Sequence, residues 1–556
     1  MSPLSPQASR RSVLALAASV PALTALAACG SAGSDADPGA AGGEPQQGGT
    51  LTYLEPQTWS TLYPPSAGFY PNGGIVHNIT DRLLHQDPET LALEPWIATA
   101  LPEVDDDATV YTFTLRTDAT YSDGTPVDAE NVVRNIDLFA KGDPSRALTV
   151  SEAINNYDRG EVVDASTVRF HFTAPSPGFA QAVSTINSGL LANATLDRSG
   201  EQFGPGNATD IIGSGPFVIA EEKIGTQLSL TAREDYAWAP ASAGHTGRAH
   251  LDGIDYVVAG EDSVRVGTVT SGQAHIARQI EAPDEPLFDA EGLHLHAAAT
   301  SGVNNGLSFR FRDPALADIR TRQALIAAID RQAIVDTLFT DSYPLATGAL
   351  ATTALGYVDT SAQYVHDPAQ AASLLDAAGW VAGADGKRSK DGTPLTLTFN
   401  EALPQPRSRE VVTLIQEQLA ELGIAVELHP GDQAAQDAAR AEVGTLQVYH
   451  SMVGRADYDV LKSQYHSGNR NTLLNGESDG SVGDPDLDEL LARIASEPEE
   501  EGRQEASAAA QKHLAEQAYI LPIFEEPQVF GYTDAVQGFA TESVGRPSFY
   551  DTWLAG

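Results

Sequence analysis

The sequence predicts a mixed α/β protein with at least two domains. Its 556 residues exceed the size at which a single hydrophobic core stops growing. Strand-type and helix-type segments alternate along the chain, and from Asp318 onwards the character turns helical. No internal repeat is visible. We therefore expect unlike α/β domains, with chain connections that cross between them.

The part of the chain before Asp318 carries several short strand signals. Residues 110–116 alternate strictly between apolar and polar, which is typical of a half-buried strand, and residues 168–172 do the same. After the turn at Asp123-Gly124, Asp128 is placed to cap the N-terminus of a helix. Further strands are expected at residues 50–54, 217–220 and 227–231.

Helical periodicity dominates the rest of the chain. Asp367-Pro368 is typical of a helix start, and Gly379 of a helix end. We interpret Asp330-Arg331 as a charged pair on a helix surface. The remaining helices are expected at residues 409–422, 487–494 and 503–517, with strands at 395–399 and 424–428.

The strongly acidic composition excludes some partners. There are 33 basic and 75 acidic residues, a formal net charge of −42. Such a surface repels nucleic acid and anionic lipid headgroups, so we expect no nucleic-acid partner and no polybasic membrane docking. We interpret the charge as a solubility feature, with a preference for cationic ligands as the alternative.

The N-terminus has the pattern of an export signal. Arg10-Arg11 precedes an uncharged run over residues 13–28, which is shorter than the roughly 20 residues that a membrane span needs. Residues 1–28 are therefore predicted to be a signal peptide. The paired arginines resemble a twin-arginine signal, and an ordinary secretory signal is the alternative.

Cys29 is the only cysteine, so the chain has no internal disulfide and no cysteine-based metal cluster. It follows Leu26-Ala27-Ala28, which resembles the bacterial lipobox in which the cysteine becomes the lipidated first residue. Residues 29–49, rich in small and polar residues, are predicted to be a flexible tether. We expect an extracytoplasmic protein held at the outer face of the cell membrane only by the lipid on Cys29.

Several motifs, in this order, resemble the extracytoplasmic solute-binding proteins of the peptide/nickel ABC transporter family (family 5, oligopeptide/dipeptide-binding type). The resemblance covers residues from about 50 to 530. Each match alone is weak evidence, but seven matches in the same order as in the family are strong evidence. The motifs are Asp81-Arg-Leu-Leu84, Leu93-Glu-Pro-Trp-Ile-Ala98, Tyr111–Arg116 with Ser122–Val127, Gly213–Phe217, Asp318–Arg331, Asp367–Gly379 and Asp457-Tyr458 with Asp486-Leu-Asp488.

The resemblance implies a two-lobe periplasmic-binding-protein-like fold with an extra subdomain in lobe I. Hinges near residues 302–305 and 525–527 would join the lobes, and the ligand would bind between them. Lobe I is expected to comprise residues 50–76, 206–301 and 526–556, its subdomain residues 77–205, and lobe II residues 302–525.

The function implied is that of a binding protein rather than an enzyme. It would capture a peptide or another amine-bearing small solute and deliver it to the permease subunits of an ABC importer, as a monomer without a cofactor. A chemosensory role is compatible with this. A secreted hydrolase is the alternative from another class, although no Gly-x-Ser-x-Gly elbow or zinc-protease signature is present.

The resemblance also suggests ligand-binding residues on lobe II. In peptide-binding relatives an aspartate before a tyrosine pairs with the ligand's ammonium group, and Asp457-Tyr458 stands at that place. Asp459 is the local alternative. Arg455 departs from the small or apolar residue expected there. It would either neutralise Asp457 or bind a ligand carboxylate, and both outcomes argue against a simple oligopeptide.

On lobe I, the segment from Gly68 to Pro71 falls where relatives offer a backbone edge to an extended ligand. Phe69 and Tyr70 are therefore candidates for ligand contact, with core packing as the alternative. Trp59 is a further candidate. A nickel or metal-chelate ligand is an alternative because His294 and His296 share a strand face, although the solvated face of a strand explains them better and no metal site is assigned.

Overall fold

The computed structural model describes residues 43–556 except 152, 404, 443, 470–473 and 475–482. The predicted signal peptide, Cys29 and the first part of the tether lie outside the described residues. Among the residues that are described, no helix is long and apolar enough to cross a membrane.

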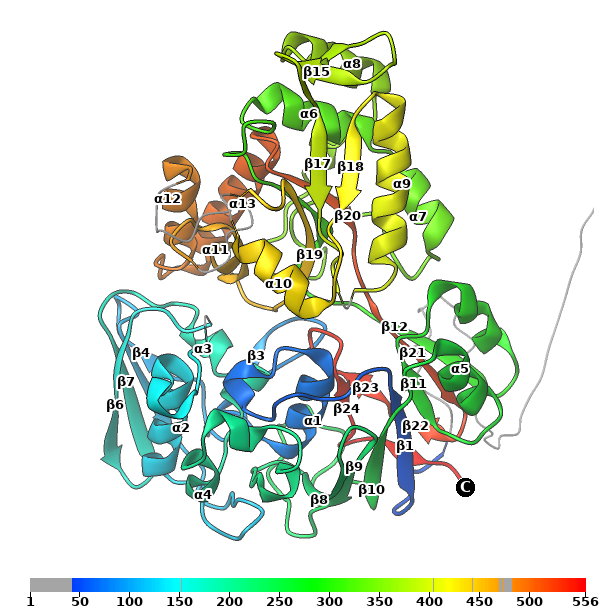
Figure 1. The fold of residues 1–556 in the computed structure, drawn as a ribbon. Helices are drawn as coiled ribbons and strands as arrows, with labels where there is room; N and C mark the ends of the chain where they lie inside the picture. The colour runs from blue at the N-terminus through cyan, green and yellow to red at the C-terminus, as the bar shows by residue number, and fades with distance from the viewer. Residues whose placement is uncertain (1–42, 152, 404, 443, 470–473, 475–482) are drawn as a thin grey trace, which may run out of the picture. The chain divides into compact units, whose positions relative to one another are not determined.

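A seven-stranded sheet forms the centre of lobe I, in the order β12-β21-β11-β1-β10-β9-β8 (Figure 1). Its central strand β1 is parallel to both neighbours, β10 and β11, and the outer pairs are antiparallel. The strands are β1 (Thr50–Glu55), β8 (Phe217–Lys223), β9 (Gln227–Ala232), β10 (Gly253–Val258), β11 (Ile276–Arg278), β12 (Leu293–Ala298) and β21 (Gln528–Thr533).

Helix α1 (Tyr70–Ile79) leads from lobe I into the next segment and is almost entirely buried. Its apolar residues join one large core with β1, β9 and β10, and Trp59 belongs to the same core. Smaller elements complete the lobe: α5 (Asp262–Thr270), β22 (Val536–Gln537), β23 (Ala540–Thr541), β24 (Pro547–Ser548) and β25 (Trp553–Leu554). The two-stranded sheet of β2 (Leu84–Gln86) and β3 (Leu93–Pro95) belongs to the subdomain segment that follows α1.

A separate four-stranded antiparallel sheet, in the order β4-β5-β7-β6, builds the subdomain. Aromatic side chains of β5 and β7 pack edge to face around Phe179, which closes this core. Helix α2 begins after Asp128, whose carboxylate accepts from Asn131 N as an N-cap. The elements are β4 (Glu103–Val104), β5 (Val110–Thr114), β6 (Tyr157–Asp164), β7 (Thr167–Phe172), α2 (Ala129–Lys141), α3 (Phe179–Ala182) and α4 (Asn193–Leu196).

Lobe II is built on a five-stranded mixed sheet, in the order β18-β17-β19-β13-β20. Helices cover both of its faces, with α7 and α9 on one side and α11, α12 and α13 on the other (Figure 1). The strands are β13 (Gly302–Phe309), β17 (Thr396–Phe399), β18 (Ala425–Leu428), β19 (Val448–Gly454) and β20 (Ile520–Phe524). The helices are α6 (Ile319–Ala328), α7 (Arg331–Leu338), α8 (Pro368–Ala377), α9 (Ser408–Glu421), α10 (Gln433–Ala441), α11 (Val460–Tyr465), α12 (Pro485–Ile494) and α13 (Glu500–Glu516).

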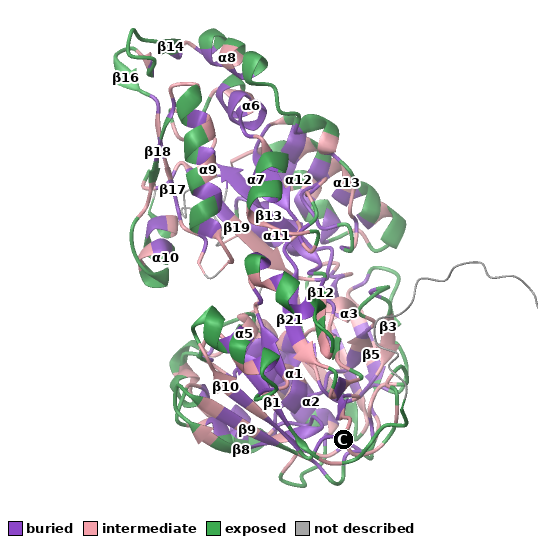
Figure 2. Cartoon of the chain, turned by 90° about the vertical axis from the view of Figure 1, so that its right-hand side faces the viewer, coloured by how far each residue is buried: buried purple, intermediate pink, exposed green. Residues whose placement is uncertain are grey.

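The burial of these helices follows their sequence periodicity. In α9 the buried positions recur at three- and four-residue intervals, and the opposite side is exposed (Figure 2). Asp367 caps α8 through Gln370 N, as the sequence indicates. Asp330 likewise caps α7, but Arg331 is not a surface residue: it is 6% exposed and donates to the carbonyls of Ala346 and Pro522.

The chain crosses between the two sheets twice. Residues 299–301 lead from β12 to β13, and residues 525–527 lead from β20 to β21. Because β12 pairs with β21 and β13 pairs with β20, both crossings lie beside each other. A side-chain hydrogen bond from Asn305 Nδ2 to Glu526 Oε2 (2.8 Å) links β13, next to the first crossing, to the second crossing.

Seven short 3₁₀ segments and a small sheet, β14-β15-β16, complete the described elements. The small strands are β14 (Val381–Ala382), β15 (Arg388–Lys390) and β16 (Thr393–Pro394). The 3₁₀ segments are Pro64–Ser66, Pro144–Arg146, Ile186–Ser188, Gly200–Phe203, Ala208–Asp210, Ala282–Asp289 and Ser361–Gln363.

Candidate functional site

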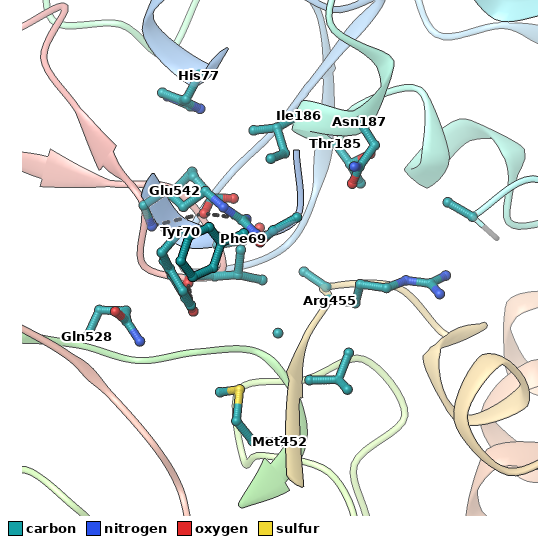
Figure 3. A pocket seen from close by; sticks show the side chains of 18 of the residues that line it. Phe69, Tyr70, His77, Thr185, Ile186, Asn187, Met452, Arg455, Gln528 and Glu542 are labelled. Carbon is teal, nitrogen blue, oxygen red and sulfur yellow. Dashed lines mark hydrogen bonds and ion pairs between the residues drawn. The ribbon is translucent and has the colours of Figure 1, made fainter. Parts of the chain in front are cut away.

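A cavity of about 510 Å³ is lined by residues from lobe I, the subdomain and lobe II. In Figure 3, Phe69, Tyr70 and Glu542 approach it from one side, Thr185, Ile186 and Asn187 from a second, and Met452 and Arg455 from a third. Several chain segments that are distant in the sequence therefore share this one space. Its charged and imidazole lining consists of His77, Arg82, His85, Arg278, Arg455, Glu526, Glu542 and Arg546.

Phe69 and Tyr70 line the lobe I wall of the cavity. Two guanidinium groups lie near the Tyr70 ring, Arg278 at 5.4 Å and Arg546 at 5.1 Å from its centroid. The Tyr70 hydroxyl donates to Val544 O (2.7 Å), and burial raises the pKa of Tyr70 to about 12. Tyr70 is thus fixed as a neutral hydrogen-bonded ring.

The backbone edge expected between Gly68 and Pro71 is much shorter than the sequence suggests. Helix α1 begins at Tyr70, and its N-cap residue Phe69 is extended, with φ −61° and ψ 134°. Pro71 in the first turn favours the helix, because its missing N–H would have no helical partner there. The segment therefore offers the cavity the side chains of Phe69 and Tyr70 together with the short backbone stretch at Gly68.

On the lobe II wall, the end of β19 brings Arg455 to the cavity. Arg455 Nε and Nη2 each donate to a carboxylate oxygen of Asp457 at 2.7 Å, a bidentate ion pair. Asp457 is 5% exposed and does not line the cavity. Of the two outcomes that the sequence leaves open for Arg455, the structure shows the pairing with Asp457.

Two further candidates lie outside the cavity lining. Tyr458 is 4% exposed, belongs to a lobe II core, and has the Arg503 guanidinium 4.6 Å from its ring centroid. Trp59 is 6% exposed in the lobe I core. Both are packing residues in this structure. Of the candidates, Phe69, Tyr70 and Arg455 share the cavity.

Most arginines of the cavity wall have a carboxylate of their own. Arg278 Nε donates to both carboxylate oxygens of Glu55 at 3.1 Å, and this buried pair holds the Arg278 pKa above its usual range despite the cost of burial. Arg546 Nη1 donates to Glu542 Oε1 (3.2 Å). With the Arg455–Asp457 pair, three of the four cavity arginines are thereby neutralised inside the protein.

Glu526 connects the cavity to the crossing between lobes. It is 6% exposed, lines the cavity, and accepts from Asn305. Burial raises its pKa to about 7, and the hydrogen bond from Asn305 and the charge of Arg278 oppose this rise. Asn305 Oδ1 also bonds to Nε2 of the buried His450 (2.6 Å), so Glu526 is the end of a hydrogen-bonded chain into lobe II.

The subdomain contacts lobe II directly. Asn155 Nδ2 donates to Asp459 Oδ2 (3.0 Å), and Lys462 Nζ donates to Asn155 Oδ1 (3.3 Å). Asp459 is buried and paired with Arg503 (2.7 Å), so it holds the contact from a rigid position. A second contact runs from Gln86 Nε2 to Ala456 O (3.0 Å).

His294 and His296, the histidine pair considered for metal binding, lie on β12 and are not part of the cavity lining. His294 is exposed, and His296 packs against Phe530 and Phe539 instead of facing solvent. Within the described residues there is no group of three or more His, Cys, Asp or Glu that could hold a metal ion.

Sequence reasoning missed much of the cavity wall. Arg82 and His85 lie within or just after the motif Asp81-Arg-Leu-Leu84, which was used only to identify the fold. Gln528 and Arg546 belong to the C-terminal return of the chain, which carries no motif. The sequence shows that these residues are polar or charged, but it does not show that they line the same cavity.

A cavity enclosed by two α/β lobes, with two adjacent chain crossings between them, defines a two-lobe ligand-binding protein. The profile of the family "Bacterial extracellular solute-binding proteins, family 5 Middle" matches residues 92–472. The chain belongs to this family of bacterial extracellular solute-binding proteins.

The curated relatives are consistent with this membership. The chain is 28% identical to "Protein XP55" of Streptomyces lividans over 358 residues, which are 62% of this chain and 59% of that protein. It is 24% identical to the "Glutathione-binding protein GsiB" of Escherichia coli O1:K1 over 447 residues, 78% of this chain and 81% of that protein.

Two solved structures show the same fold. The periplasmic binding protein DppA of Helicobacter pylori, solved with the peptide STSA, has a TM-score of 0.75 at 18% identity, covering 92% of this chain and 99% of that chain. NikA of Brucella suis, solved with Fe(III)-EDTA, has a TM-score of 0.75 at 22% identity, and the match covers 91% of this chain and 100% of that chain. The predicted family and the two-lobe α/β fold are confirmed.

Proposed function

We propose that this chain is the substrate-binding lipoprotein of an ABC importer. It captures a peptide or peptide-like solute in the cavity between its lobes and delivers the solute to the permease subunits. The observation that carries the proposal is the cavity itself, which is built by both lobes and the subdomain next to the two crossings. A ligand in that position contacts all three parts at once and favours the arrangement in which they meet.

The comparisons support a peptide-like ligand. DppA of Helicobacter pylori was solved with a tetrapeptide, and the Escherichia coli relative is named for glutathione binding. The wall of the cavity suits such a solute because it combines aromatic rings with paired charges and amide side chains. Arg455 lines the cavity and Asp457 does not, which supports Arg455 as the ligand-facing group of that ion pair.

Attachment through Cys29 is part of the proposal. A lipidated cysteine followed by a flexible segment would keep the lobes close to the permease and raise their effective concentration there. Cleavage before Cys29 would produce a mature chain that starts with the tether.

The mature protein, produced without its signal peptide, tests the binding function directly. Solutes that copurify with it are released by denaturation and identified by mass spectrometry, and a mixture of short peptides is screened for an increase in melting temperature. We expect a copurified or screened solute to raise the melting temperature. A protein that gives neither result, but hydrolyses a chromogenic ester or amide, would instead be the secreted hydrolase.

A further inference from the structure

Arg82 differs from the other arginines of the cavity wall. It is 2% exposed, yet no carboxylate of the described residues lies within ion-pair distance of it. Within the described part of the chain its side chain makes one hydrogen bond, from Nη2 to Nδ1 of His77 (2.8 Å). Arg82 Nε is buried without a partner. A guanidinium has five N–H donors, so most of this group's donors are unused.

Buried arginines elsewhere in the chain are satisfied in a different way. Arg322 donates to four main-chain carbonyls, and Arg331 donates to three. These groups hold loops together and need no counter-charge. Arg82 has no such carbonyl among the described residues, so a structural role of that kind does not explain it.

Two acids act on Arg82 electrostatically, but neither forms an ion pair with it. Burial, assisted by the positive charge of Arg82, keeps the pKa of His77 well below its usual range, so His77 is a neutral acceptor. The Trp96 ring lies 5.3 Å from the Arg82 guanidinium. The larger effect comes from Glu542, which is held by Arg546. The smaller comes from Asp81, whose carboxylate accepts from Tyr236 and Trp238. Burial lowers the pKa of Arg82 to about 10, so it is charged at neutral pH.

A desolvated cation without a counter-charge is costly, and here it borders a cavity large enough for a small solute. We propose that Arg82 is the binding site for a carboxylate group of the transported solute. The planar guanidinium fork matches a carboxylate in two parallel hydrogen bonds. A phosphate dianion fits less well, because the Glu542 carboxylate also lines the cavity and repels a second negative charge.

This inference rests on the proposed function and specifies its substrate class: a solute with a free carboxylate. The test uses the tetrapeptide Ser-Thr-Ser-Ala as the free acid and as its C-terminal amide, together with sodium acetate and sodium phosphate. Affinity is measured by titration calorimetry and by the shift in melting temperature, for the wild type, Arg82→Met and Arg159→Met. Arg159 is an exposed arginine of β6 and serves as the matched control.

We expect the free acid and acetate to bind the wild type and Arg159→Met alike. Arg82→Met should bind the free acid about tenfold more weakly or worse, and the amide should bind the wild type more weakly than the acid by a similar factor. The comparison of acid with amide needs no variant, so it holds even if Arg82→Met folds poorly.

Equal affinity of the wild type for acid and amide would overturn the inference, as would unchanged binding of the acid by a folded Arg82→Met. Arg82-dependent binding of phosphate alone would assign the site to phosphate and overturn the carboxylate. Failure of both the acid and acetate to bind would overturn it too. The proposed function is judged separately, because solutes without a carboxylate can still copurify or raise the melting temperature.

Discussion

Arg455 binds Asp457 through two parallel hydrogen bonds of 2.7 Å, and only Arg455 of this pair lines the cavity. The carboxylate that the sequence suggests as the partner of a ligand ammonium therefore already has a cation. An ammonium group can reach Asp457 only by displacing a bidentate guanidinium, which is among the stronger side-chain interactions. The cavity therefore offers the ligand the guanidinium of Arg455, and the carboxylate of Asp457, which lies outside the lining, largely balances its charge.

The Asp457→Ala variant should be less stable than the wild type. The side chains of Arg455 and Asp457 are 18% and 5% exposed. Removal of the Asp457 carboxylate therefore leaves the mostly buried guanidinium of Arg455 without this partner, at a cost of about 1–3 kcal/mol in the free energy of unfolding. Urea denaturation measures the change. Asp158→Ala, which breaks the exposed pair with Arg159, is the control and should cost less than about 1 kcal/mol. Equal losses of unfolding free energy in the two variants would show that the buried Arg455–Asp457 pair stabilises the protein no more than an exposed ion pair does.

Glu526 should make the folded protein sensitive to pH. Its pKa is about 7 in the folded state against 4.5 for an ordinary glutamate, so between these values the folded state holds a proton that the unfolded state has released. Stability should therefore fall as the pH rises from about 4.5 to 7, by at most about 3 kcal/mol from this group. Above pH 7 the loss from Glu526 is complete.

The contribution of Glu526 is isolated by the Glu526→Gln variant, whose amide oxygen can still accept from Asn305. Urea unfolding of both proteins across pH 4.5–8 should show the difference in stability growing in favour of the variant as the pH rises. A difference that stays constant with pH would contradict the raised pKa.

Asn155→Ala should weaken solute binding without a large effect on folding. Asn155 bonds to both Asp459 and Lys462 of lobe II, and each lost bond is worth about 0.5–1.5 kcal/mol. The two bonds together stabilise the closed arrangement that holds the solute by about 1–3 kcal/mol, so their loss lowers the affinity about five- to 150-fold. Calorimetry with a copurified solute measures it, and Asn207→Ala, away from both the cavity and lobe II, is the control. An unchanged Kd would mean that this contact is not part of solute capture.

Replacement of Cys29 by alanine should release the protein from the membrane. The described residues contain no helix that could span a bilayer, and the proposed attachment is the lipid on this one cysteine. Fractionation of cells that produce the wild type, Cys29→Ala and the control Ser31→Ala should find only Cys29→Ala outside the membrane fraction. Retention of Cys29→Ala with the membrane would place the anchor elsewhere.

Local signals in the sequence correspond closely to the structure. Asp128 and Asp367 cap the helices that they were expected to cap, because capping depends on a side chain and an N–H only a few residues away. The alternation of residues 110–116 likewise matches the half-buried strand β5. These features need no information about distant parts of the chain.

The sequence did not predict the surroundings of several side chains, because those surroundings are formed by residues that are distant in the chain. Trp59 and Tyr458 could not be assigned to a core or a cavity wall from their residue type, since both environments favour aromatic rings. Arg331 and Arg82 look alike in the sequence, and both are buried. They differ in whether main-chain carbonyls happen to surround the guanidinium, and that depends on loops far along the chain.

Strand β21, formed near the C-terminus, lies between β11 and β12 inside the sheet of lobe I. This sheet therefore cannot be completed until almost the whole chain has been synthesised, whereas all the strands of the lobe II sheet precede β21. Lobe II can acquire its native sheet first, while lobe I retains an unfilled strand position with open backbone donors and acceptors. A chain that ends before residue 528 would expose that gap permanently and be prone to aggregation or proteolysis. Completion of lobe I thus depends on the synthesis of residues 528–533.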